Sequence, residues 1–253
     1  MLFYAYCFVL VDSVGDGDYK LIWSDEFDGP EIDKEKWGFF IGKHGAEEQY
    51  YTDRPDNSII RDGKLVIIAR KEPYEGYKYT SASLHSNFNS TDFGGWTYGK
   101  FQVGAKLPRG LGQWPAIWLY PTDSKFGPCP YSGEIDIMEA VGVDPDIIYG
   151  TIHCEKYNSY NHTAKYGTVK DTTIYTDFHD YMVIWNTESI TFFYDRNAYF
   201  TYIPESKEIG VWPFIERFYM RLNMAIGGWG GTPDDSLFPT EYEVDYVRIF
   251  AQV

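Results

Sequence analysis

The sequence is divided into many short strand-like segments by Gly, Pro, Asn and Asp, and it contains no long segment with helical periodicity. A clear example is the apolar segment 65–69, which follows the turn residues Asp62 and Gly63. Asp-Gly supplies the positive φ angles that a tight hairpin turn needs. Because no linker or low-complexity tract interrupts this pattern, residues 19–253 are predicted to form one all-β sandwich or barrel. The number of strands and the need to protect sheet edges favour a sandwich of two curved sheets.

One predicted strand, residues 134–139 (EIDIME), carries three carboxylates. Alternation places Glu134 and Asp136 on one face and two isoleucines on the other. Glu139 has the wrong parity, and a β-bulge around Met138 would return Glu139 to the acidic face and turn Met138 towards the core. Glu side chains spaced in this way can bring their carboxyls to roughly 5 Å, as a retaining glycosidase needs. Repulsion among these carboxylates is a cost that folding alone does not explain, which favours a functional site over a solvated acidic face.

Aromatic residues make up 19% of the 253 residues, more than an ordinary core requires. Flat aromatic faces suit the apolar faces of sugar rings, although many will serve packing. The net charge of −15 argues against nucleic acid as a partner and favours a neutral over an acidic polysaccharide.

Three cysteines are too few for a disulfide framework, and the sequence leaves open whether Cys129 and Cys154 pair. No spacing of Cys or His suggests zinc. Residues 1–18 are predicted to be a leader or signal-peptide remnant, with an apolar part at 1–11 that lacks a basic n-region and is followed by an acidic stretch. A structured apolar strand fits residues 1–11 equally well. No other segment is long and apolar enough to span a bilayer, so no membrane partner is expected.

The acidic strand, together with the preceding segment 114–118 (WPAIW), closely resembles glycoside hydrolase family 16, and within it the laminarinase-like endo-β-1,3-glucanases. Further motifs of that family occur in its order over nearly the whole chain, at residues 23–27, 49–52, 62–65, 98–101, 150–153, 222–228 and 244–248. The resemblance implies a β-jelly-roll sandwich of two curved antiparallel sheets, with a concave sheet that forms the substrate cleft. It also implies a secreted, monomeric enzyme that cuts internal β-1,3 bonds of laminarin-like glucans, with mixed β-1,3-1,4-glucan as a side substrate.

The resemblance assigns roles to the acidic strand. Glu134 would be the nucleophile that forms a glycosyl-enzyme intermediate, and Glu139 the general acid and then base. Asp136, between them, would tune both neighbours through a hydrogen bond or a shared proton. The family places a histidine near the acid/base, at the position of His153, on a strand expected to neighbour the acidic one. The insertion of Met138 is typical of laminarinases, agarases and carrageenases rather than of lichenases and xyloglucan enzymes.

Four residues are candidates for substrate binding. Asn57 matches a family asparagine on the glycone side of the cleft. Trp114 and Trp118 are candidates for sugar stacking, and Trp114 is expected to be the exposed member because Pro115 makes its strand irregular. Trp229, within a glycine-rich loop, fits a stacking, lid or packing role.

Catalysis in this family needs no cofactor, but a structural Ca²⁺ often lies on the convex face. The matching positions are the backbone carbonyls of Glu26 and Gly63 and the side chain of Asp245, a set of oxygen ligands that suits a hard cation. Such an ion would tie the two ends of the chain together. Asp245 could equally be an ordinary surface acid.

The chain departs from the family at two places. Many laminarinases carry an arginine within the stretch 79–86, where this chain has none, and arginine is also usual near residues 103–104. These departures leave the preferred sugar open. The alternatives are a hydrolase of the same fold that acts on a marine galactan, agarase- or carrageenase-like, and a non-catalytic β-glucan-binding protein. Binding proteins of this kind can lack the carboxylates, and here all three are present.

Overall fold

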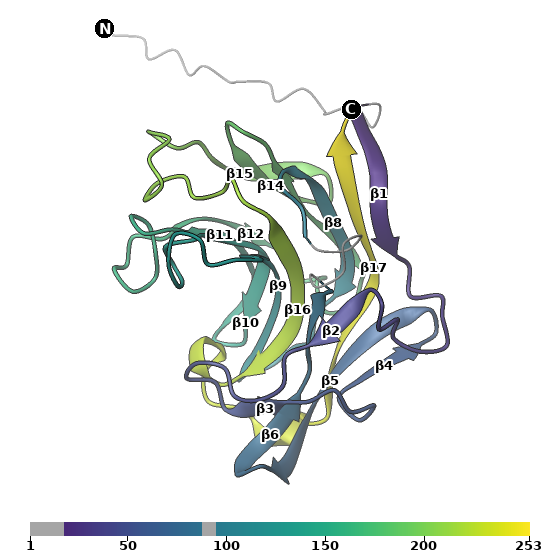
Figure 1. Ribbon diagram of the computed structural model, residues 1–253. Helices are drawn as coiled ribbons and strands as arrows, with labels where there is room; N and C mark the ends of the chain where they lie inside the picture. Colours follow the sequence, from purple (N-terminus) through teal and green to yellow (C-terminus); the bar gives the residue numbers. More distant parts are fainter. Residues whose placement is uncertain (1–17, 88–94) are drawn as a thin grey trace, which may run out of the picture.

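The computed structural model describes residues 18–87 and 95–253, and its strands form two sheets (Figure 1). The described part is an all-β sandwich, as predicted, and its two helical elements are the short 3₁₀ turns η2 (Gly228–Gly230) and η3 (Asp235–Leu237). Apart from Asp18, the expected leader lies outside the described residues.

The larger sheet has ten strands. Its main path is β15 (Asn197–Tyr202), β14 (Ile190–Tyr194), β13 (His179–Trp185), β8 (Gly99–Lys106), β17 (Thr240–Gln252), β5 (Lys64–Tyr74), β6 (Tyr77–Ser81) and β3 (Gln49–Tyr51), with β1 (Tyr19–Asp25) paired to β17 and β4 (Ser58–Arg61) paired to β5. The pair of β3 with β6 is parallel, whereas antiparallel sheets were expected. The chain reaches β3 from a strand of the other sheet, so β3 is not joined to β6 by a hairpin.

The smaller sheet has seven strands and carries the acidic strand near its middle. The order is β12 (Lys165–Lys170), β11 (Asp144–His153), β10 (Glu134–Val141), β9 (Gln113–Pro121), β16 (Phe218–Ile226), β7 (Ser83–Ser86) and β2 (Trp37–Phe39). Figure 1 shows that β9, β10, β11 and β16 are curved, with their concave side turned away from the larger sheet.

The core lies between the two sheets because each strand alternates its side chains between two faces. On β8, Phe101, Val103 and Ala105 are fully buried, and Ile135 on β10 and Ile152 on β11 face them from the other sheet as members of the same cluster. Burial of one large apolar side chain contributes about 1.5–3 kcal/mol, so this apolar face fixes the register of the strands.

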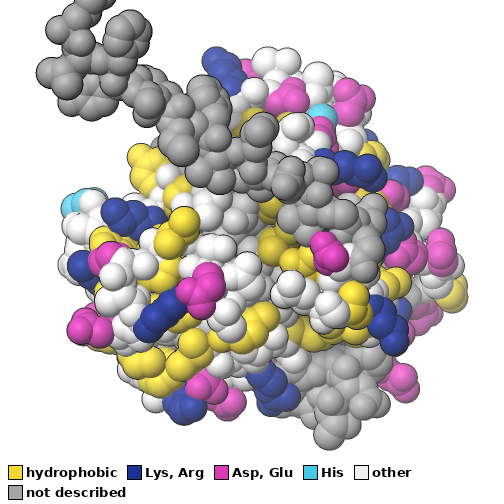
Figure 2. Space-filling view, turned by 90° about the horizontal axis from the view of Figure 1, so that it is seen from above, with side chains coloured by type: hydrophobic (Ala, Val, Ile, Leu, Met, Phe, Trp, Pro, Cys, Tyr) yellow, Lys and Arg dark blue, Asp and Glu magenta, His cyan; other side chains and the backbone are white. Residues whose placement is uncertain are grey.

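The two ends of the described chain and one predicted turn meet on the larger sheet. The first strand, β1, pairs antiparallel with the last, β17 (Figure 1). The hairpin of β4 and β5 turns through Asp62 (φ 52°) and Gly63 (φ 69°), as the sequence indicated. On the face drawn in Figure 2, acidic and basic side chains are interspersed, so no single patch of one sign dominates that face.

Candidate active site

A bulge in β10 places three carboxylates in one cleft. The pairing of β10 with β9 shifts between Asp136 and Met138, and its pairing with β11 shifts between Asp136 and Glu139. Met138 is fully buried in the core, while Glu139 lines the same cavity as Glu134. The predicted bulge and the inward turn of Met138 are therefore confirmed.

The cleft consists of two adjoining cavities of about 830 and 480 Å³ on the hollow side of the smaller sheet. The first extends over β11 and β12 and the second over β9 and β16, and they share lining residues on both sides of β10. Trp114, Cys129, Glu134, Glu139 and Tyr160 line both. A chain-like ligand can therefore cross the acidic strand from one cavity to the other.

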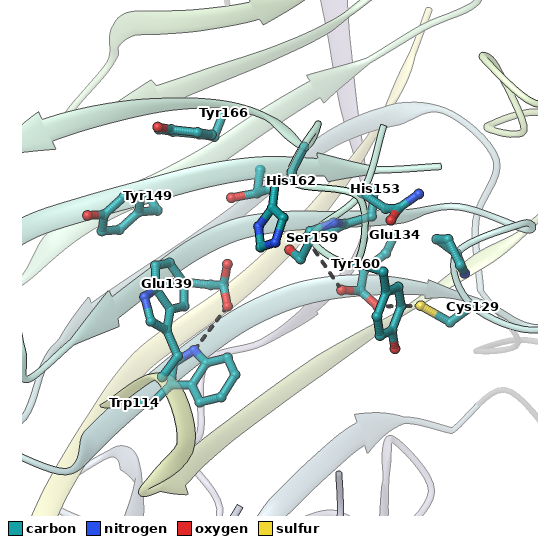
Figure 3. A pocket seen from close by; sticks show the side chains of 15 residues that line it. Trp114, Cys129, Glu134, Glu139, Tyr149, His153, Ser159, Tyr160, His162 and Tyr166 are labelled. Carbon is teal, nitrogen blue, oxygen red and sulfur yellow. Dashed lines mark hydrogen bonds and ion pairs between the residues drawn. The ribbon is translucent and has the colours of Figure 1, made fainter. Parts of the chain in front are cut away.

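Side chains from the neighbouring strands β9 and β11 and from the loop before β10 contact the carboxylates (Figure 3). The Nε2 atom of His153 lies 4.0 Å from Oε1 of Glu134. It also lies 3.1 Å from Oδ2 of Asp136. Trp114 Nε1 donates a hydrogen bond of 3.0 Å to Glu139 Oε1. On the opposite side, the thiol of Cys129 donates to Glu134 Oε2 at 3.8 Å. Each of the three carboxyls thus has a polar side chain beside it: an imidazole, an indole N–H or a thiol.

The strand position of His153 was predicted correctly, and His153 lines the same cavity as Glu139. His153 pairs directly with Glu134 in the register of β10 and β11, whereas Glu139 pairs with Tyr149 four residues away. The imidazole therefore lies at the nucleophile end of the acidic strand, and its charge also opposes the rise that burial causes in the pKa of the expected acid/base, Glu139.

Burial controls the protonation of the acidic strand. Burial, with a further contribution from the charge of Asp136, raises the pKa of Glu134 to about 7, while the positive charges of His153 and Arg221 oppose the rise. Burial and the same aspartate raise the pKa of Glu139 well above its ordinary value, and burial also raises the pKa of Asp136. Three ionised carboxylates would repel one another here, so the site retains protons at neutral pH. A protonated Glu139 is the form that a general acid requires.

Aromatic side chains flank the carboxylates on both sides. Trp114 is half-buried and Trp118 is 8% exposed, so Trp114 is the more exposed member of the pair, as expected. Trp118 nevertheless lines the second cavity and donates from Nε1 to Asn223 Oδ1 at 2.7 Å. Trp229 is 41% exposed and lines the first cavity, with its ring edge-on to those of Trp114 (5.7 Å) and Tyr149 (5.0 Å). All three tryptophans lie where a sugar could reach them.

The structure does not bring Asn57 into either cavity. Its side chain is fully buried, and its amide nitrogen donates to the carbonyl of Ile68 (3.0 Å) and to Thr80 Oγ1 (2.9 Å). Its oxygen accepts from Thr52 Oγ1 (2.6 Å) and from Arg54 (3.0 Å). Because these bonds use the polar atoms of the amide within the fold, the placement of Asn57 corrects the expectation of a direct sugar contact: the residue holds the loop before β4 against β5 and β6.

The residues expected to bind calcium lie on the larger sheet. Glu26 directly follows β1, Gly63 lies in the turn before β5, and Asp245 occupies a bulge in β17, the strand that pairs with both β1 and β5. The carboxylate of Glu26 is occupied by a bidentate pair with Arg248, at 3.0 and 2.7 Å, so its backbone carbonyl is the oxygen in question. The strand pairing makes β1, β17 and β5 neighbours. The three elements that carry the expected oxygen ligands therefore lie side by side.

Several cleft residues were not singled out from the sequence. Arg221 and Asn223 on β16 line the second cavity, because they alternate with the buried Met220, Leu222 and Met224. This two-residue period was visible in the sequence and could have identified both. The loop residue Tyr160, 78% exposed and lining both cavities, carries no comparable signal.

Comparisons with known proteins agree with this geometry. A sequence profile of "Glycosyl hydrolases family 16" matches residues 45–248. A "Beta-glucanase" of Rhodothermus marinus is 42% identical over 250 residues, which cover 93% of this chain and 86% of the relative. The solved laminarinase of Rhodothermus marinus superposes with a TM-score of 0.88 at 41% identity, covering 93% of this chain and 98% of that one. The structure of SCLam, described as a non-specific endo-β-1,3(4)-glucanase, gives 0.87 at 39% identity, covering 94% and 92%.

Proposed function

The chain belongs to glycoside hydrolase family 16, and we propose that it is a retaining endo-β-1,3-glucanase that cleaves laminarin-like glucans, with mixed β-1,3-1,4-glucan as a side substrate. The observation that carries the proposal is the bulge in β10, which turns Glu139 into the same cleft as Glu134. Two carboxyls on one face of the sugar site, one ionised and one protonated, are what double displacement requires.

In the first step, the carboxylate of Glu134 attacks the anomeric carbon and Glu139 gives its proton to the departing glycosidic oxygen. The carbon–oxygen bond breaks, and the sugar becomes an ester of Glu134. Burial raises the pKa of Glu139 well above its ordinary value, so Glu139 holds the proton that it must donate.

In the second step, the now ionised Glu139 removes a proton from water, and the hydroxide oxygen attacks the anomeric carbon from the face that the leaving group left. The ester bond breaks and Glu134 regains its charge, so the configuration of the sugar is retained. The hydrogen bond from Trp114 stabilises Glu139 in its ionised form between the two steps. The imidazole of His153 near Asp136 and Glu134 favours the charged form of the nucleophile.

The open, aromatic-lined cleft and the net charge of −15 support a neutral polymer as substrate. The decisive experiment measures release of reducing ends from laminarin, lichenan and agarose. We expect laminarin to be cleaved fastest, lichenan more slowly and agarose not at all. Release from agarose alone would support the galactanase alternative instead.

The variant Glu134→Gln separates an enzyme from a binding protein. We expect this variant to lose hydrolysis of laminarin and to keep its affinity, because the amide preserves the shape of the site without the nucleophile. If wild-type protein binds laminarin but releases no reducing ends, the protein is a β-glucan-binding protein and the proposed activity is wrong.

We also propose that a structural Ca²⁺ is held by the backbone carbonyls of Glu26 and Gly63 and the carboxylate of Asp245. The ion would join the end of β1 and the bulge in β17 to the turn before β5, away from the chemistry. Ca²⁺ should raise the melting temperature of the wild type and of the exposed-acid control Asp123→Asn, but not that of Asp245→Asn. An equal rise in all three proteins would contradict this site.

Finally, we propose that the protein acts outside the cell as a monomer, because a polymeric glucan does not enter a cell intact. In the described part of the chain, no helix is long and apolar enough to cross a membrane. Activity recovered from the culture medium, and a mass near 29.3 kDa by light scattering, are the expected results. Activity confined to the cell interior would contradict secretion, and a mass twice as large would contradict the monomer.

A further inference from the structure

A buried arginine lies within the cleft without a carboxylate partner. Arg221 of β16 lines the second cavity and is only 6% exposed. Its Nη2 donates a hydrogen bond of 3.2 Å to Ser83 Oγ on the neighbouring strand β7, while its buried Nε has no hydrogen-bond partner. No ion pair holds the guanidinium among residues 18–87 and 95–253. Burial of a cation that keeps unused donors is costly.

The surroundings of this guanidinium are aromatic. It lies over the ring of Trp118 at 4.1 Å and 5.4 Å from the ring of Phe40, and both aromatic residues line the same cavity. Stacking of this kind fixes the plane of the guanidinium, so its donors have a defined direction. A flat aromatic side chain beside fixed hydrogen-bond donors is an arrangement that suits a sugar ring with its hydroxyls.

The position of Arg221 also bears on a departure of the sequence from its family. The segment 79–86, where many laminarinases have an arginine, contains none, but Ser83 within it receives the hydrogen bond from Arg221. A guanidinium is therefore present against this segment, supplied by the adjacent strand β16.

We infer that Arg221 is a substrate-binding residue that donates hydrogen bonds to hydroxyl groups of a glucosyl unit in the second cavity, next to Trp118. This inference rests on the proposed glucanase function. A neutral sugar fits better than a sulfated or uronic one because the acids Glu47, Glu134 and Asp136 line the same cavity and would repel an anionic group.

Arg221 also acts on the nucleophile through its charge. Its positive charge opposes the rise in the pKa of Glu134 that burial causes. Loss of the charge should therefore raise the pKa of Glu134 and move the acid limb of the pH profile of kcat/KM to higher pH.

The direct test is binding of β-1,3-linked glucose oligosaccharides, measured by calorimetry in the inactive Glu134→Gln background. Adding Arg221→Met should weaken binding about 10- to 100-fold, since hydrogen bonds from a charged donor are lost. Arg221→Lys keeps the charge but not the fork of donors. Its affinity should lie between that of the Glu134→Gln protein and that of the protein with Arg221→Met added. The control Arg217→Met removes an exposed arginine just before β16 and should leave binding unchanged.

Thermal unfolding will show whether Arg221→Met has a folding defect. A second variant, which moves the arginine to the neighbouring strand, tests the inference in that case. Ser83→Arg combined with Arg221→Leu returns a guanidinium to the segment 79–86 from β7, and it should restore at least part of the affinity. Affinity unchanged in Arg221→Met, or the same loss in Arg217→Met, would overturn the inference. Failure of wild-type protein to cleave laminarin would instead overturn the proposed function, so the two failures are distinguishable.

Discussion

Trp114 donates a hydrogen bond of 3.0 Å from its indole nitrogen to the carboxyl of Glu139, across the boundary between β9 and β10. The variant Trp114→Phe keeps an aromatic surface in the cleft but removes this donor. Since the hydrogen bond lowers the pKa of Glu139, its loss should raise that pKa. Glu139 must be protonated for the first step, so the basic limb of kcat/KM should move to higher pH by about one unit.

The matched control for this prediction is Trp229→Phe. Trp229 contacts the ring of Trp114 and lines the first cavity, but its indole makes no hydrogen bond to Glu139. Its substitution should change KM without moving the basic limb. If the limb stays in place in Trp114→Phe, the indole does not control the acid/base.

Azide should distinguish the roles of the two glutamates. In Glu134→Ala, azide can enter the space of the nucleophile and displace an activated leaving group directly, which gives an α-glycosyl azide from a β-linked substrate. In Glu139→Ala, the glycosyl ester still forms from a substrate with an activated leaving group, and azide then attacks it from the opposite face to give the β-glycosyl azide.

The anomeric configuration of each azide can be read by NMR. An exchange of the two products between the variants would reverse the assignment of nucleophile and acid/base. The absence of azide rescue in both variants, with folded protein, would argue against a covalent intermediate and therefore against retention.

The acidic strand should reduce the stability of the fold at neutral pH. Burial raises the pKa of Glu134 from 4.5 to about 7, so the folded protein binds more protons than the unfolded chain between these values. The stabilising effect of protonation is complete below about pH 4.5 and is lost as the pH rises through 7. At pH 8, Glu134→Gln should therefore unfold at a higher urea concentration than the wild type, with a gain on the order of 1–3 kcal/mol that disappears near pH 4.

Glu241, an acid whose pKa is lowered by folding, provides the control. The pKa of Glu241 is lowered by its pair with Arg61 on the surface, so Glu241→Gln should slightly destabilise the protein at pH 8 rather than stabilise it. A pH-independent effect of Glu134→Gln would contradict the linkage between this carboxyl and folding.

The arrangement of the side chains on the catalytic strand could be predicted from the alternation of acidic and apolar residues at 134–139. Only a bulge could place Glu139 beside Glu134 while Met138 enters the core, and the structure has that bulge. Pro115 was harder to place from the sequence, because its missing N–H suggested an edge strand, an irregularity or the first residue of a strand. It lies in the central strand β9, just beyond the last residue pair that β9 makes with β10, at Ala116.

The rest of the cleft depends on contacts between distant segments. A resemblance gave Asn57 a place near the sugar, but its amide is used up by Thr52, Ile68 and Thr80, which only the folded arrangement of β5 and β6 brings together. The unpaired state of Arg221 also depends on which strand lies beside β16. Neither could be read from alternation or spacing.

Cys129 should react slowly with alkylating reagents, although it lies at the nucleophile. The structure leaves Cys129 and Cys154 unpaired, and only Cys129 is accessible, since Cys154 is fully buried. Burial and the nearby charge of Glu134 raise the pKa of the Cys129 thiol to about 12. Because the thiolate is the reactive form, inactivation by iodoacetamide should be slow at pH 7 and rise about tenfold per pH unit up to pH 10 without a plateau.

An adduct on Cys129 would project into both cavities, so alkylated protein should lose activity, and a β-1,3-glucan oligosaccharide should protect it. Cys129→Ser should keep most of its activity and resist the reagent. Inactivation that persists in this variant would place the reactive thiol elsewhere in the chain. A plateau near pH 8.5 would mean that the thiol is not shielded, and the cleft around Glu134 would then be more open to water than its burial indicates.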